Sequence, residues 1–299
     1  MVAEARLKTF AGITVALGAL AAAQVCPAQP SAITQEIVAT ALPVEGAPLA
    51  EPGSYEVAMG PAPGFPGLVV FHPKNLDAFP RRDTLPVFVW GNGGCAINST
   101  RYSGFLSTIA SHGFLVLATA AQKGPVRRQN ADDLRSALDW AGEENARDGS
   151  PLKGKIATDK VAVMGQSCGG FLAIALGADP RVGTIGVFNS GAQRRFDELK
   201  KLHGPVLLIN GHERDFMMAD SKATFDAIVA WPAFYGARHG AGHTATVDHP
   251  GGGEFANVAS SWARWQLKGD TKAAAMFVGK KCGLCTNPNW DVESKGLEK

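Results

Sequence analysis

The stretch from Lys160 to Gly170 reads Lys-Val-Ala-Val-Met-Gly-Gln-Ser-Cys-Gly-Gly. An apolar run typical of a buried strand ends at Gly165, and helix-forming residues follow from position 171 onward. Between them stands Gly-x-Ser-x-Gly, the pattern in which a serine occupies the tip of a tight strand-to-helix turn and projects its hydroxyl. The flanking glycines leave room where a Cβ would clash with nearby backbone. We therefore predict a nucleophile elbow with Ser167 at its tip.

A serine hydroxyl is a weak nucleophile unless a base takes its proton and an acid orients that base. After an elbow of this kind, the acid and then the base follow along the chain, each on a loop after a later strand. The strand predicted over 205–210 runs into Gly-His-Glu-Arg-Asp, which ends at Asp215. Asp215 is therefore the expected acid, with Glu213 and Asp220 as alternatives.

The expected base is a histidine in the last loop of the sheet. A strand predicted over 232–237 leads into the glycine-rich stretch Arg-His-Gly-Ala-Gly-His-Thr over 238–244, where an imidazole can turn toward the serine. His243 is the expected base. His239 and His249 flank it, and we interpret both as ordinary loop histidines.

Acyl transfer also needs donors for the oxyanion, each worth roughly 3 kcal/mol in the transition state. The backbone N–H of Cys168, directly after the serine, is one expected donor. A strand predicted over 85–90 runs into Gly-Asn-Gly-Gly-Cys, whose small residues allow close approach of the backbone to a substrate oxygen. We expect the second donor to be the N–H of Asn92 or, failing that, of Gly93.

With these motifs in order, the sequence resembles the α/β-hydrolase superfamily, and in particular the branch of dienelactone hydrolases, chlorophyllases and cutinase-like serine esterases. The resemblance covers about residues 55 to 268. Its motifs are Trp-Gly-Asn-Gly-Gly at 90–94, Ile-Ala-Ser-His-Gly-Phe-Leu-Val-Leu at 109–117, the elbow, and Gly-Ala-Gly-His-Thr at 240–244. It implies the α/β-hydrolase fold and the same assignments of nucleophile, acid, base and oxyanion donors. Trp90 and Cys168 depart from the residues that many relatives have at those positions.

The remaining pattern fits an α/β fold, with a mostly parallel central sheet of about eight strands flanked by helices. Between 189 and 205 there is room for one short helix, so we expect an open site without a large cap domain. The other predicted elements are two strands within 55–73, strands over 113–119 and 182–189, and helices over 102–111, 131–141 and 255–267.

Four parts are expected along the chain. They are a signal peptide (1–23), an Ala/Pro-rich linker or N-terminal arm (24–52), an α/β-hydrolase catalytic domain (53–270) and a C-terminal tail with a C-x-x-C motif (271–299). Arg6 and Lys8 precede an apolar run that is too short to span a bilayer. The protein is therefore predicted to be exported, secreted or periplasmic, without stable membrane insertion after cleavage.

Export favours disulfides over free thiols. Cys168 follows the nucleophile and Cys95 lies just past the expected oxyanion loop. Since two segments that donate to one oxyanion must be close in space, we expect these cysteines to pair, the alternative being two separate buried thiols. Cys282 and Cys285 are predicted to form a structural disulfide that ties down the tail, because a redox C-x-x-C would stand at a helix start after an early strand. Cys26 is the odd cysteine, and no metal or cofactor is expected.

Charge and composition narrow the choice of partner. The chain has 29 basic and 27 acidic residues, a formal net charge of +2, and no basic stripe, so a nucleic-acid partner is not expected. Gln166, Phe216, Met217 and Phe234 are candidates for the substrate pocket. They suggest an apolar surface beside the polar centre.

The predicted function is that of a secreted serine hydrolase cleaving small or polymeric carboxylic esters through an acyl-enzyme. A peptidase or amidase with the same residues is one alternative, and a catalytically silent binding protein of the same fold is the other. The peptidase is disfavoured because no added domain that selects peptides is visible. The silent fold is disfavoured because such a protein would be free to lose one of the three catalytic groups.

Overall fold

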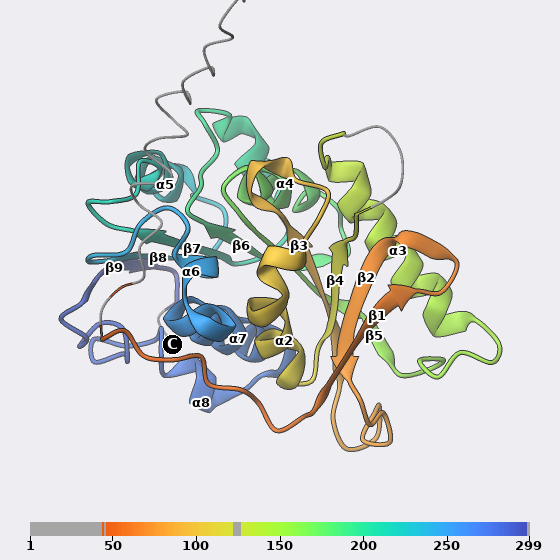
Figure 1. Cartoon of the computed structure of the whole chain (residues 1–299). Helices are drawn as coiled ribbons and strands as arrows, with labels where there is room; N and C mark the ends of the chain where they lie inside the picture. Colours follow the sequence, from red (N-terminus) through yellow and green to blue (C-terminus); the bar gives the residue numbers. More distant parts are fainter. Residues whose placement is uncertain (1–43, 45, 122–126, 298–299) are drawn as a thin grey trace, which may run out of the picture.

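Within the described residues, nine strands form one sheet in the order β1-β2-β4-β3-β5-β6-β7-β8-β9 (Figure 1). The structure is a computed structural model, and it describes residues 44, 46–121 and 127–297. The six strands from β4 through β8 in this order pair in parallel, whereas β1, β2 and β9 pair antiparallel with their neighbours. The mostly parallel α/β fold is confirmed, with one strand more than the eight expected.

The predicted strands are all present, with small shifts at their ends. β5 begins four residues before the predicted start, because its first half carries the exposed Asp159 and lacks the continuous apolar pattern. The bounds are β1 Val57–Ala62, β2 Phe65–Pro73, β3 Leu85–Gly91, β4 Leu115–Thr119, β5 Ile156–Gln166, β6 Val182–Phe188, β7 Val206–Gly211, β8 Ala233–Arg238 and β9 Trp290–Lys295.

Helices cover both faces of the sheet. Successive β3 side chains point to opposite sides, so Val87 and Val89 pack in a core with α3 and α4, whereas Phe88 and Trp90 pack in a second core with α2 and α7. The α-helices are α2 Ser103–Ser111, α3 Ala131–Ala146, α4 Cys168–Leu176, α5 Met218–Ala227, α6 Ala245–Asp248, α7 Gly253–Lys268 and α8 Thr271–Ala274, and the 3-10 helices span Gly93–Cys95, Thr100–Tyr102, Phe196–Lys201 and Pro250–Gly252.

The loops at the carboxyl ends of the parallel strands come together at one edge of the sheet, where α/β folds place their sites. The connection from β6 to β7 holds only the short 3-10 helix Phe196–Lys201. This agrees with the expectation that no large cap domain is inserted there.

Both ends of the described chain contact the helices or the sheet. The N–H of Glu51 donates to Asn257 of α7 at 2.7 Å, and the N–H of Gly53 donates to Ser111 of α2 at 2.8 Å. The C-terminal segment, set apart as a tail from its sequence, contributes β9 to the sheet. The predicted signal peptide and most of the predicted arm lie outside the described residues.

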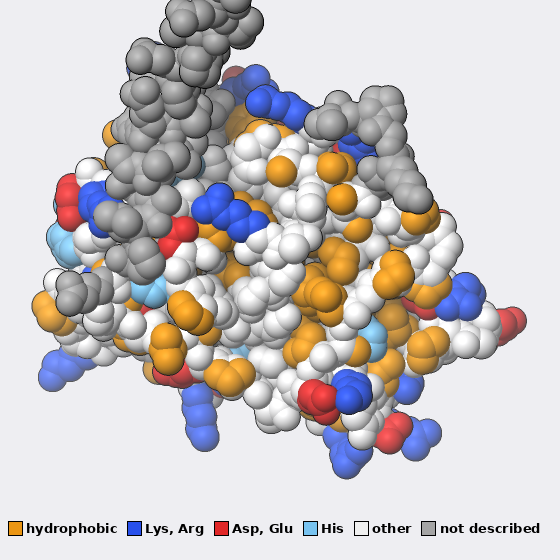
Figure 2. All heavy atoms as spheres, viewed as in Figure 1, with side chains coloured by type: hydrophobic (Ala, Val, Ile, Leu, Met, Phe, Trp, Pro, Cys, Tyr) orange, Lys and Arg blue, Asp and Glu red, His pale blue; other side chains and the backbone are white. Residues whose placement is uncertain are grey.

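The surface carries charges of both signs. On the face seen in Figure 2, Lys and Arg side chains alternate with Asp and Glu around the edge, and hydrophobic side chains are spread over the middle. In the part of the chain that the structure describes, no helix combines the length and the apolarity needed to cross a membrane.

Candidate active site

The chain turns sharply at Ser167, where β5 ends and α4 begins. Ser167 has φ 53° and ψ −122°, a conformation that L-residues rarely adopt. The turn requires its glycines, because a Cβ on Gly165 would lie 2.2 Å from the carbonyl oxygen of Gly169 and a Cβ on Gly169 would lie 2.0 Å from that of Gly91. The glycines thus let β3, β5 and α4 approach closely, and the turn has the shape that the motif predicted.

Three side chains that are far apart in the sequence form a hydrogen-bonded row. Nε2 of His243 lies 2.9 Å from Oγ of Ser167, and Nδ1 of the same imidazole lies 2.8 Å from Oδ1 of Asp215. The His243 side chain is 2% exposed and the Asp215 side chain is fully buried. Each residue follows the end of a different parallel strand, β5, β7 or β8.

The Asp215 carboxylate receives three further hydrogen bonds. Oδ2 accepts from Nδ2 of Asn189 at 2.8 Å and from the N–H of Gly211 at 3.1 Å. Oδ1 accepts from the N–H of Met217 at 3.0 Å. A buried carboxylate needs such donors to replace water, and these donors fix which oxygen faces His243.

The alternative acids point elsewhere. Glu213 accepts from the N–H of Gly240 at 3.1 Å and lies 2.9 Å from Nδ1 of His212, and Asp220 accepts from the N–H of Gln193 at 3.1 Å. Neither of these carboxylates has a hydrogen bond to His243 among the contacts of the described residues.

The alternative histidines also have other partners. His249 accepts a hydrogen bond from the N–H of Val44 at 2.8 Å, and Nε2 of His239 lies 3.1 Å from Asp291. The structure therefore brings His243, and not its two neighbours, to Ser167.

The loop after β3 differs from what we expected of an oxyanion loop. The N–H of Asn92 donates to Oε1 of Gln129 at 2.8 Å, and the N–H of Gly93 donates to the hydroxyl of Tyr102 at 2.9 Å. Both expected donors are thus bonded inside the protein and are not presented to a substrate. The sequence could not reveal this, because Gln129 and Tyr102 lie outside the loop.

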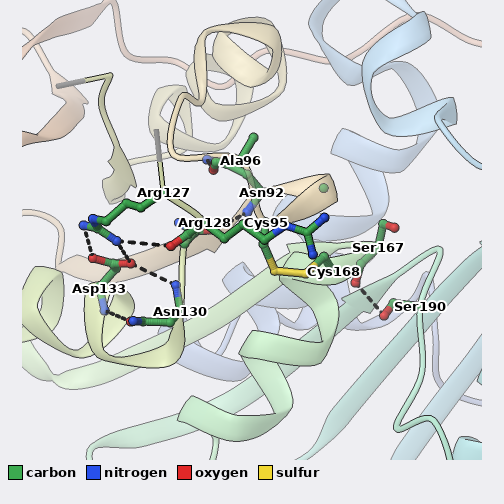
Figure 3. The surroundings of a disulfide bond; sticks show 12 residues. Asn92, Cys95, Ala96, Arg127, Arg128, Asn130, Asp133, Ser167, Cys168 and Ser190 are labelled. Carbon is green, nitrogen blue, oxygen red and sulfur yellow. Dashed lines mark hydrogen bonds and ion pairs between the residues drawn. A yellow bond between two sulfur atoms is a disulfide. The ribbon is translucent and has the colours of Figure 1, made fainter. Parts of the chain in front are cut away.

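Two predicted disulfides are present. Cys95 and Cys168 are joined beside Ser167, with their Cα atoms 5.2 Å apart (Figure 3). This bond connects the loop after β3 to the first residue of α4, and the N–H of Gln129 adds a hydrogen bond to the carbonyl of Cys95 at 2.7 Å. Cys282 and Cys285 form the second disulfide. Cys26 lies outside the described residues.

The pocket candidates divide into two groups. The Phe216 ring is 37% exposed and its centroid lies 4.0 Å from that of His243, and Met217 is half-buried beside it. Phe234 was wrongly expected at the pocket, because it is fully buried and packs on Phe277. Gln166 is also buried, at 3% exposure, and is not a rim residue.

One group of side chains has the composition of a metal site, although the sequence suggested none. Possible ligand atoms of His212, His239 and Asp291 all lie within 4.8 Å of one another. The group was missed because its members come from the ends of β7 and β8 and from β9, which are distant in sequence. Asp291 has its pKa lowered, chiefly by the hydrogen bond from His239. The absence of a resident metal stays a prediction.

Burial changes the acidity of two groups near the site. It raises the pKa of Tyr102 to about 12, so this hydroxyl keeps its proton at any physiological pH. It also raises the pKa of Asp248, which accepts a hydrogen bond from Thr244, the residue after His243. Hydrogen bonding from Thr244 and the positive charge of Arg101 oppose this shift in part.

The sequence analysis missed the residues that hydrogen-bond to Asp215 and to the loop after β3. Asn189 stands at the carboxyl end of β6, and that position is the signal by which it could have been found. Tyr102 is the last residue of a 3-10 helix and Gln129 lies just before the N-cap of α3, and neither carries a local signal of its role.

A protein-family model described as PETase, PET hydrolase-like, matches residues 31–289. A comparison with curated proteins gives no significant match.

Proposed function

The chain belongs to the PET hydrolase-like family and is thus a serine carboxylic-ester hydrolase, and we propose that Ser167, His243 and Asp215 carry out its reaction. The observation behind this proposal is the row in which one imidazole bridges the serine hydroxyl, at 2.9 Å, and a buried carboxylate, at 2.8 Å. These distances are those of hydrogen bonds through which a proton can pass.

In the proposed mechanism, Oγ of Ser167 attacks the ester carbonyl while Nε2 of His243 takes its proton. The imidazolium then gives that proton to the departing alkoxide, which leaves as the alcohol, and an acyl-enzyme remains. Water, deprotonated by His243, attacks the acyl carbon, and the proton returns to Ser167 as the acid leaves. Asp215 holds the tautomer with Nδ1 protonated and stabilises the imidazolium.

The oxyanion needs donors that the substrate can reach. The N–H of Cys168, at the start of α4, is our first donor, because it follows the nucleophile and shares the field of the helix N-terminus. Since Asn92 and Gly93 donate within the protein, we assign the second donor to Gly94. Gly94 is exposed and directly precedes Cys95, which is disulfide-bonded to Cys168.

For the substrate, we propose a polymeric aromatic ester, with export of the enzyme to reach it. The family description, PET hydrolase-like, supports this. The exposed ring of Phe216 beside His243 offers an aromatic surface for such a chain. The two disulfides are compatible with an oxidising compartment.

The test is hydrolysis of p-nitrophenyl esters from acetate to palmitate and of an amorphous poly(ethylene terephthalate) film, with wild type and Ser167→Ala in parallel. Wild type should cleave short esters and release aromatic acid from the film, and Ser167→Ala should lower kcat by about a millionfold. Near-wild-type activity in the variant would remove Ser167 from the mechanism. Cleavage of matched amides in preference to esters would favour a peptidase, and a failure to react with a fluorophosphonate would favour a silent fold.

A further inference from the structure

A continuous chain of hydrogen bonds passes behind Ser167. The N–H of Gly93 donates to the hydroxyl oxygen of Tyr102 at 2.9 Å, and this hydroxyl donates to Oε1 of Gln166 at 2.7 Å. Nε2 of Gln166 then donates to the carbonyl oxygen of His243 at 2.7 Å. The chain joins the loop after β3 to the backbone of the histidine that faces Ser167.

The two side chains in the middle are buried, Gln166 at 3% exposure and Tyr102 at 5%. The Tyr102 hydroxyl uses both its acceptor and its donor capacity, and the Gln166 amide uses its oxygen and its nitrogen. Since a buried polar group costs free energy when it lacks a partner, loss of any member leaves the others unsatisfied.

Gly93 fits this arrangement sterically as well. A Cβ at this position would lie 2.1 Å from Oε1 of Gln166 and 2.6 Å from the hydroxyl of Tyr102. The backbone of the loop after β3 therefore packs directly against the side chains of Gln166 and Tyr102.

The loop after β8 that carries His243, which we call the base loop, needs support from outside its own backbone. His243 is reached through Gly240-Ala241-Gly242, and Gly240 has φ +73°. Glycine allows many backbone conformations, so this approach does not by itself fix the imidazole. Displacement of a catalytic group by about 1 Å is enough to lower the rate of a reaction strongly.

We propose that Tyr102 and Gln166 are positioning residues that hold the base loop and the β3 loop at fixed places around Ser167. Neither touches substrate, and both act through backbone groups. The inference rests on the proposed function, because it takes His243 as the base.

The first test is steady-state kinetics of Gln166→Leu and Tyr102→Phe on p-nitrophenyl acetate. Each variant should lower kcat about ten- to a hundredfold, because the loss of a buried hydrogen bond at each end frees the loops. KM should change by less than about twofold, since no substrate contact is removed. Tyr55→Phe is the matched control, because its hydroxyl donates to Asp83, outside the site, and its kcat should stay at the wild-type value.

The second test is the double variant Tyr102→Phe/Gln166→Leu. Residues that act through one chain of bonds give non-additive losses, so the double variant should have nearly the kcat of the worse single variant. Active-site titration with a fluorophosphonate gives the concentration of folded enzyme, so a purely structural effect would appear as fewer active sites with unchanged kcat per site.

Wild-type kcat per site in both single variants, or fully additive losses in the double variant, would overturn the proposal. Ser167→Ala separates this failure from failure of the function itself. If Ser167→Ala is inactive while the two single variants are normal, the positioning role of Tyr102 and Gln166 is wrong and the catalytic assignment stands.

Discussion

Nδ2 of Asn189 donates a hydrogen bond of 2.8 Å to Oδ2 of Asp215, the oxygen that faces away from His243. Asn189 stands just past the end of β6 with φ 47°, a left-handed conformation that asparagine tolerates better than most residues. It is fully buried. The conformation aims its amide at the acid and leaves Oδ1 of Asp215 for the imidazole.

Asn189→Leu should lower kcat by roughly ten- to a hundredfold, because a hydrogen bond to a charged group contributes about 1.5–3 kcal/mol. Steady-state kinetics on a short p-nitrophenyl ester measures this. Asn210→Leu is the matched control, since Asn210 is equally buried but donates to Ser221. If both variants lose stability alike and neither loses turnover, the bond to Asp215 has no catalytic consequence.

Asp215→Asn should reduce kcat far more than Asp220→Asn. The amide at 215 no longer favours the imidazole tautomer that accepts from Ser167, and comparable changes of a buried acid cost about 10⁴-fold. The Asp220 carboxylate instead accepts a hydrogen bond from the N–H of Gln193. Kinetics of the two variants at matched folded concentration decides the assignment, and the reverse ranking would move the role of acid to Asp220.

The fold and the hydrogen-bonded contact of Ser167, His243 and Asp215 were predictable because their signals are local. Each parallel strand is an apolar run that ends in a glycine-rich or polar loop, as at Gly165 and Gly211. Such strands end at one edge of the sheet, so residues just past them meet. The sequence alone therefore predicts that Ser167, Asp215 and His243 lie together.

The misplaced residues depend on tertiary contacts that no local pattern encodes. Asn92 was expected to donate to substrate, but Gln129, distant in sequence, takes its N–H. Phe234 lies on the face of β8 that packs on Phe277. Successive side chains of a strand point to opposite faces, so a shift of one residue in the predicted pattern changes the face. β9 was missed because only Trp290 in it is buried, so the strand has little hydrophobic signal.

Gly169→Ala should abolish activity and lower stability severely, because its Cβ would lie 2.0 Å from backbone atoms of Gly91 that cannot move without shifting β3. Gly142→Ala in α3 is the control, as its Cβ meets nothing within 4 Å, and it should stabilise by about 0.5–1 kcal/mol. Urea denaturation measures both. An active, wild-type-stable Gly169→Ala would contradict the close packing at the elbow.

Asp248→Asn should make stability less dependent on pH as the pH rises above about 4, the ordinary pKa of an aspartate. Because burial raises the pKa of Asp248 in the folded protein, the folded state keeps the proton to higher pH than the unfolded chain does. The wild type therefore loses stability as pH rises from the unfolded to the folded pKa, and the asparagine variant lacks this loss. The free energy of unfolding at several pH values tests it, and parallel profiles for the two proteins would refute it.

Removing the Cys95–Cys168 disulfide should affect both stability and catalysis. Its cysteines are 73 residues apart, so the bond restricts the unfolded chain by roughly 4 kcal/mol, whereas the Cys282–Cys285 bond, with a separation of 3, contributes roughly 2 kcal/mol. Cys95→Ala/Cys168→Ala should also lower kcat, because it frees the loop that we expect to supply the second oxyanion donor. Cys282→Ala/Cys285→Ala should leave kcat unchanged, since this pair lies near the C-terminus. Peptide mapping of the purified, non-reduced protein provides the independent check, and finding Cys95 and Cys168 as free thiols would remove the basis for both expected effects.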